Sequence, residues 1–210
     1  MKQYALITGS YWVFTLTDGA LRMLVVLYFH ELGYSPLDIA FLFLFYEVFG
    51  IITNLFGGWL AARIGLSATI ISGLFLQTFA LGMLLVDSSY LTVAYVMAAQ
   101  ALSGVAKDLN KLGAKSSVKL VAGDNQTKLY RWVAWLTGSK NALKGVGFFA
   151  GGAGLATIGF SASVVTMLLC VGVVGVVALL LLDTNLGKAS FKPKFSELFS
   201  KSRQINLLSA

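Results

Sequence analysis

Two lysines stand four residues apart inside an apolar stretch of the chain, at Lys140 and Lys144. On a helix this spacing puts both ammonium groups on the same face. If the stretch spans a membrane from Arg131 onward, the helical rise places Lys140 about 13 Å and Lys144 about 20 Å beyond that residue. Both then lie inside a hydrocarbon layer about 30 Å thick, where a cation costs at least about 2.5 kcal/mol on insertion scales. The pair therefore predicts a carboxylate partner, a water-filled cavity or an anionic ligand.

The first apolar segment carries a polar stripe that ends in two opposite charges. Its members follow the 3-4 spacing of one helical face and are Thr8, Tyr11, Thr15, Asp18 and Arg22. Asp18 and Arg22 are four apart, so they can pair along the helix. Such a pair can fix packing alone or can face a substrate.

Further charges interrupt the second and fourth apolar segments. Glu47 lies about 13 Å in from Asp38, with Asn54 on the same helical face. It predicts either a partner for a lysine of another helix or a group that carries a proton or contacts a substrate. The fourth segment has a polar face with Asp108 beside it, made of Gln100, Gly104, Lys107 and Lys111. These two lysines either extend their stems to the membrane surface or face the protein interior.

The count of intramembrane charges leaves an excess of positive charge. Five cations face three carboxylates, Asp18, Glu47 and Asp108, so two positive charges have no protein partner. A cavity of that sign suits a small, multiply anionic solute with phosphate-like or carboxylate groups. The candidate substrate-binding residues are Arg22, Lys107, Lys111, Lys140, Asn141 and Lys144, and the candidates for proton coupling or charge pairing are Asp18 and Glu47.

The composition indicates an integral membrane protein. Hydrophobic residues make up 57% of the chain and charged residues 12%, with a mean hydropathy of +0.79. A soluble domain would carry about twice that charged fraction. The single cysteine, Cys170, excludes an internal disulfide framework and a multi-thiol metal site. Because no hydrolytic triad, nucleotide-binding glycine loop or metal-ligand cluster is apparent, we expect no enzyme, no cofactor and no metal site.

Six apolar segments are long enough to span a membrane, which predicts an all-α membrane protein. They cover residues 4–29, 37–62, 67–86, 90–114, 131–160 and 161–182. The connections after the first, third and fifth segments carry no lysine or arginine, whereas the other side of the predicted membrane carries eleven. This asymmetry predicts a multi-pass protein with both termini in the cytoplasm. It also attributes most of the net charge of +7 to cations beside anionic lipid, so no nucleic-acid partner is expected.

The chain divides into three predicted parts. Residues 1–186 form the six-span bundle. Residues 187–204 form a basic amphipathic segment on the cytoplasmic membrane surface, with Phe191, Phe195 and Phe199 at four-residue spacing. Residues 205–210 are apolar enough to be the start of a seventh span.

Six spans with cytoplasmic ends resemble the first half of a major facilitator superfamily transporter. In that family two six-helix halves, each a three-plus-three inverted repeat, face a central site. The family's signature between spans two and three is matched here by Gly58, Arg63 and Gly65, which the resemblance makes the gating-loop residues. Ala62 stands in the place of its acid, and Leu66 and Ser67 replace its basic pair.

Three longer strings resemble the organoarsenical efflux permeases of that superfamily, the ArsJ type. They are Tyr11–Leu27, Ala106–Lys111 and Leu136–Phe149. This resemblance implies secondary active efflux of 1-arseno-3-phosphoglycerate across a bacterial inner membrane in arsenate resistance. The compound is made with a glyceraldehyde-3-phosphate dehydrogenase and is multiply anionic.

The resemblance also implies a protein about twice this length, so the chain is expected to be an amino-terminal half that needs a second six-helix half or a second copy. Two alternatives stay open. The solute can be another phosphorylated or anionic compound. The chain can also be a non-transporting truncated half that acts only as a membrane partner.

Overall fold

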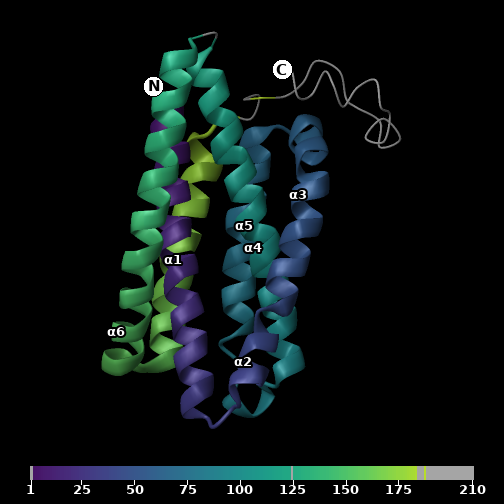
Figure 1. Cartoon of the computed structure of the whole chain (residues 1–210), viewed down its shortest axis with the longest axis vertical. Helices are drawn as coiled ribbons and strands as arrows, with labels where there is room; N and C mark the ends of the chain where they lie inside the picture. The colour runs from purple at the N-terminus through teal and green to yellow at the C-terminus, as the bar shows by residue number, and fades with distance from the viewer. Residues whose placement is uncertain (1, 124, 184–186, 188–210) are drawn as a thin grey trace.

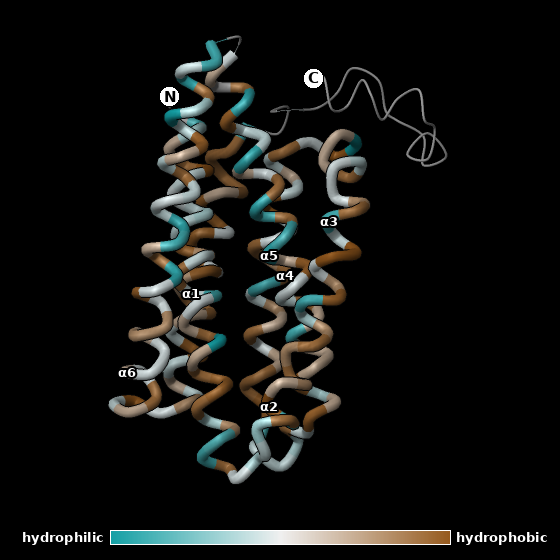
Figure 2. Tube along the Cα trace, in the orientation of Figure 1, coloured by the Kyte–Doolittle hydropathy of each residue, from teal (hydrophilic) through white to brown (hydrophobic). Residues whose placement is uncertain are grey.

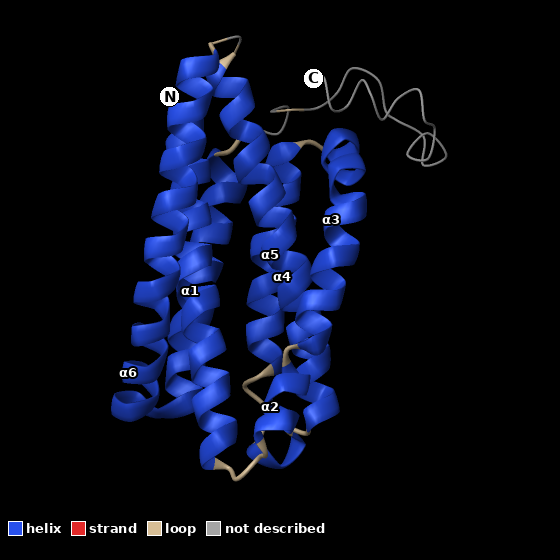
Figure 3. Cartoon of the chain, viewed as in Figure 1, coloured by secondary structure: helices blue, strands red, loops and turns tan. Residues whose placement is uncertain are grey.

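A computed structural model describes residues 2–123, 125–183 and 187 of the chain. Within these ranges the backbone forms helices and short loops, with no strand (Figure 3). The helices lie side by side in an elongated bundle (Figure 1). They are α1 (Lys2–Glu31), α2 (Pro36–Leu42), α3 (Leu44–Ile64), α4 (Leu66–Met83), the short 3-10 helix η1 (Ser88–Tyr90), α5 (Val93–Ala122) and α6 (Gln126–Leu181).

The predicted apolar segments overlap the observed helices, but several of them begin, end or break at different residues. The segments 4–29 and 67–86 correspond to the single helices α1 and α4. The segment 37–62 is not one helix, because the chain breaks at Phe43 between α2 and α3. The segment 90–114 continues as α5 to Ala122, beyond its predicted end.

The two last predicted segments both lie in α6, which folds back on itself at Gly159 (Figure 1). This residue has φ 80° and ψ 176°, a conformation that is essentially restricted to glycine. Ser163 after the reversal comes back to Gly154 before it, where an added Cβ would lie 2.7 Å from the serine hydroxyl. The reversal thus lies within two residues of the predicted boundary between 160 and 161.

Within the described ranges, four stretches of helix are long and apolar enough to cross a membrane: Gln3–Glu31, Pro36–Ile64, Leu66–Met83 and Gln126–Leu181. Apolar residues run along most of their length, and hydrophilic residues interrupt α1, α3 and α5 (Figure 2). Large apolar side chains remain exposed on the outside, such as Phe79, Phe149 and Leu180. A surface of this kind is suited to lipid rather than water. Six spans and a three-plus-three repeat stay predictions.

Polar contacts bring the N-terminus, the α3–α4 connection and the end of α6 together at one end of the bundle (Figure 1). The Gln3 side chain donates to the Leu181 carbonyl at 3.0 Å and accepts from the Asp183 amide at 3.1 Å. The Ser67 hydroxyl donates to the Asp183 carbonyl at 2.6 Å. The predicted segments at 187–204 and 205–210 lie outside the described residues, apart from Gly187.

Glycines let α1 and the first part of α6 approach backbone to backbone. A Cβ at Gly147 would collide with the Leu16 carbonyl, and one at Gly151 would collide with the Ala20 carbonyl. A Cβ at Gly19 would lie 2.7 Å from the Lys144 carbonyl. This close packing fixes Lys144 beside α1. Gly154 differs, because it faces Ser163 within α6.

The α1–α6 contact predicts a strong effect of Gly151→Leu. The backbone of Ala20 cannot give way unless the helices separate, so we expect the free energy of unfolding to fall by about 1–3 kcal/mol. Thermal unfolding in detergent measures the change. Gly138→Ala is the control, because an added Cβ there meets no atom within 4 Å. Equal unfolding midpoints for both variants would contradict the packing.

Candidate functional site

A pocket of about 250 Å³ lies among α1, α3, α5 and α6. It brings together all five cations predicted to lie in the membrane, with two of the three acids. Asn141 is not among its lining residues, and its side chain is exposed. The residues that line the pocket are Tyr11, Phe14, Thr15, Asp18, Arg22, Glu47, Lys107, Lys111, Lys140 and Lys144.

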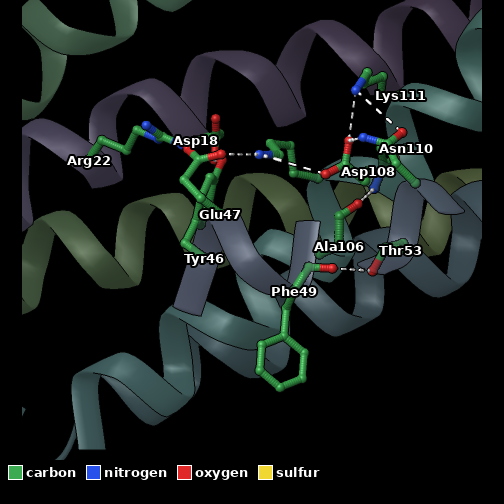
Figure 4. A network of polar contacts seen from close by, with 12 residues as sticks. Asp18, Arg22, Tyr46, Glu47, Phe49, Thr53, Ala106, Asp108, Asn110 and Lys111 are labelled. Atoms are coloured by element: carbon green, nitrogen blue, oxygen red, sulfur yellow. Dashed lines mark hydrogen bonds and ion pairs between the residues drawn. The ribbon is translucent and has the colours of Figure 1, made fainter. Parts of the chain in front are cut away.

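Helices α1 and α3 meet through Arg22 and Asp18, but not through the pair allowed by their spacing. The Arg22 guanidinium forms an ion pair with Glu47 at 2.6 Å, and Asp18 accepts a hydrogen bond from the Tyr46 hydroxyl at 2.5 Å (Figure 4). The Asp18–Arg22 ion pair that their spacing on α1 allows is not among the ion pairs of the described residues. Each of the two side chains finds a partner on α3 instead.

Tyr46 holds the centre of this network, and the sequence reasoning missed it. Its ring is fully buried, with the Arg22 guanidinium carbon 4.1 Å and the Lys107 ammonium 4.2 Å from its centroid. Both distances are within the range of cation–π attraction. Gly104 on α5 lies against the Tyr46 backbone, where a Cβ would collide with the tyrosine carbonyl. The sequence holds one indication of the role of Tyr46: its polar hydroxyl stands directly before Glu47 in a mostly apolar segment.

Asp108 joins α3 to α5 from a buried position. It accepts a hydrogen bond from Lys111 at 2.9 Å (Figure 4). It also accepts one from the Asn54 amide at 3.1 Å. The Lys107 ammonium lies between two acids, 3.7 Å from Asp108 and 3.6 Å from Glu47. Both lysines line the pocket, and their role in substrate binding stays a prediction. Glu47 is bound by cations of two other helices, and its role in proton coupling stays a prediction.

The two lysines of α6 differ from the other cations of the pocket. Among the described residues, no carboxylate lies within ion-pair distance of Lys140 or Lys144. Both side chains are partly buried, and the Lys144 ammonium lies 5.9 Å from the centre of the Phe148 ring. The three acids are already engaged by the other three cations and by Tyr46. The pocket therefore carries two positive charges that the described carboxylates do not balance.

The predicted gating-loop residues lie where α3 ends. Gly65 has φ 94° and ψ 159° and separates α3 from α4, which a glycine allows at little cost. The Arg63 guanidinium lies 5.4 Å from the centre of the Trp59 ring. A Cβ at Gly58 would meet no atom within 4 Å. Their gating role stays a prediction.

The apolar helices and the charged pocket among them define a helical membrane protein with a polar site. The Major Facilitator Superfamily model matches residues 7–209 of the chain, so the protein belongs to this superfamily of membrane transporters. The membership supports transport in general and a multi-pass location in a membrane. A search of curated proteins finds none that matches the chain.

The Tyr46 network predicts a loss of stability in Tyr46→Phe. The change keeps the ring under Arg22 but leaves the buried Asp18 carboxylate without the donor that the structure shows. We expect the free energy of unfolding to fall by about 1–3 kcal/mol, measured by thermal unfolding in detergent. Tyr28→Phe is the control, because it removes a hydroxyl from a ring stacked on Phe160, outside the pocket. A similar loss in both variants would argue against the Asp18–Tyr46 bond as the cause.

Proposed function

We propose that the protein is a secondary active transporter that exports a small organic polyanion. The observation that carries this proposal is the pair Lys140 and Lys144, which face the pocket without a described carboxylate partner. Two ammonium groups on one helical face can bind two anionic oxygens through charge-assisted hydrogen bonds. A solute with more than one negative charge would balance the pocket.

The remaining cations act differently in this proposal. Arg22, Lys107 and Lys111 already form ion pairs with carboxylates, so they contribute positive electrostatic potential to the pocket. They can bind the solute directly once those ion pairs break. Glu47 is the better of the two candidates for a coupled proton. Its side chain is 56% exposed, whereas Asp18 is buried and bound by Tyr46. Protonation of Glu47 would weaken its hold on Arg22 and Lys107 and free both for the solute.

The specific solute that we propose is 1-arseno-3-phosphoglycerate, exported in arsenate resistance across a bacterial inner membrane. The support is the resemblance to organoarsenical efflux permeases in the strings Tyr11–Leu27, Ala106–Lys111 and Leu136–Phe149. These strings contain every residue that lines the pocket except Glu47. The arsenate group at one end of this compound and the phosphate at the other would each bind one lysine of the pair Lys140 and Lys144.

Two partners follow from this proposal. A glyceraldehyde-3-phosphate dehydrogenase would supply the solute. A second six-helix half or a second copy would complete the site, since the family places its site between two halves. The rival solute is another phosphorylated three-carbon acid, because phosphate and carboxylate oxygens would bind the same lysines.

Transport by membrane vesicles tests the role of the lysine pair. Everted vesicles that contain the protein are expected to accumulate 1-arseno-3-phosphoglycerate. Lys140→Gln and Lys144→Gln should each lower the initial rate at least about tenfold, since each loses a charge-assisted hydrogen bond. Lys119→Gln is the matched control, because it removes an exposed cation that does not line the pocket.

Unchanged accumulation in both pocket variants would contradict the site. Competition with 3-phosphoglycerate separates the rival solutes, because a general phosphoglycerate carrier would be inhibited at equal concentration. Vesicles that accumulate none of these solutes would favour the non-transporting partner.

A further inference from the structure

A second hollow, distinct from the charged pocket, lies between α1 and the first part of α6. It has a volume of about 460 Å³ and is lined by Tyr4, Ala5, Thr8, Gly9, Trp12, Trp132 and Trp135. A neighbouring hollow of about 510 Å³ is lined by Lys128, Arg131 and the same Trp132 and Trp135. The two hollows adjoin at these tryptophans, and we name them together the tryptophan groove. It shares no residue with the charged pocket.

The aromatic rings of the tryptophan groove hold one another in place. Trp132 packs edge-on against Tyr4 at 4.7 Å between ring centres and against Trp135 at 6.0 Å. Trp12 lies 4.9 Å from Trp135, and its indole N–H donates to the Ser139 hydroxyl at 3.0 Å. Tryptophan is enriched where membrane proteins cross from hydrocarbon to headgroups. The groove thus has a rigid apolar wall suited to that depth.

Two buried hydroxyls in the groove have no partner in the described part of the chain. The Tyr4 hydroxyl and the Thr8 hydroxyl make no hydrogen bond there, although the two residues are only 5% and 4% exposed. A buried polar group without a partner is unusual in a folded protein. Both residues line the groove, but their hydroxyl oxygens are covered, so a bound molecule with acceptor oxygens reaches them only when a neighbouring side chain turns aside.

The mouth of the groove is positively charged. Lys128 and Arg131 are exposed there, and no carboxylate of the described residues lies within ion-pair distance of either. Arg131 directly precedes the apolar run of α6, which places both cations at the predicted membrane surface. A molecule with a phosphate at its head and an apolar tail complements the charge and the wall together.

We infer that the tryptophan groove is a binding site for an anionic phospholipid. Its phosphate binds Lys128 and Arg131, its glycerol ester oxygens accept from the Tyr4 and Thr8 hydroxyls, and one acyl chain lies along the tryptophans. The bound lipid fills the seam between α1 and α6 at the end of the bundle that holds the N-terminus (Figure 1). This site is independent of the proposed solute, because it shares no residue with the charged pocket.

Tryptophan fluorescence reports on this groove directly. Three of the four tryptophans of the chain line it, and Trp59→Phe removes the fourth. The full-length Trp59→Phe protein is placed in phosphatidylcholine vesicles that contain either brominated phosphatidylglycerol or brominated phosphatidylcholine, whose bromines quench a nearby indole. We expect the anionic lipid to bind at least about tenfold more tightly than the zwitterionic one, since each surface cation contributes about fivefold.

Two variants test the parts of the site. Lys128→Gln combined with Arg131→Gln should bring the ratio of binding constants close to one, whereas the control Lys119→Gln, another exposed cation, should leave it unchanged. Tyr4→Phe keeps the ring edge-on against Trp132 and should weaken the binding of both lipids about threefold through the lost hydrogen bond. Equal quenching by the two lipids in the protein without these changes would overturn the inference. Absence of quenching by either lipid would overturn it as well and would show that a protein surface covers the groove.

Discussion

Positive charge held inside an apolar bundle is the constraint on which the other features of this structure depend. Five cations from α1, α5 and α6 reach one pocket, and the carboxylates that touch this network number three. Lys140 and Lys144 have no acid within ion-pair distance among the described residues, and at the membrane depth predicted from the sequence an unpaired cation is costly. The bundle bears this cost because the solute that it is proposed to bind can offset it.

Ion pairs and hydrogen bonds hold the helices on one side of the pocket, and close helix packing holds those on the other. On the first side, α1, α3 and α5 are joined by a chain of bonds in which Tyr46, Glu47 and Asp108 each engage another helix. On the second side, glycine contacts at Gly147 and Gly151 set the position of α6 against α1. The lysines of α6 are therefore placed by backbone contact and not by ion pairs. Their charges stay available to a ligand while the helix that carries them is held.

Helical spacing in the sequence predicted which side chains share a face, but not which helix that face meets. It placed Asp18 and Arg22 on one side of α1, and both do line the pocket. It allowed them to pair with each other because a single helix offers no other partner, whereas the fold brings Tyr46 and Glu47 within reach. The break at Phe43 was missed for a related reason. Apolar composition continues through it, and hydropathy does not register a local change of backbone direction.

The dependence of binding on ligand charge tests whether Lys140 and Lys144 bind an anionic solute. Isothermal titration of the purified protein in detergent can compare three ligands of similar size: glycerol, glycerate and 3-phosphoglycerate. If Lys140 and Lys144 are an unbalanced pair that awaits an anion, affinity rises with each added anionic group, by about tenfold or more per charge-assisted hydrogen bond. Equal affinity for all three ligands, or tightest binding of neutral glycerol, would contradict an anion-binding role of the two lysines.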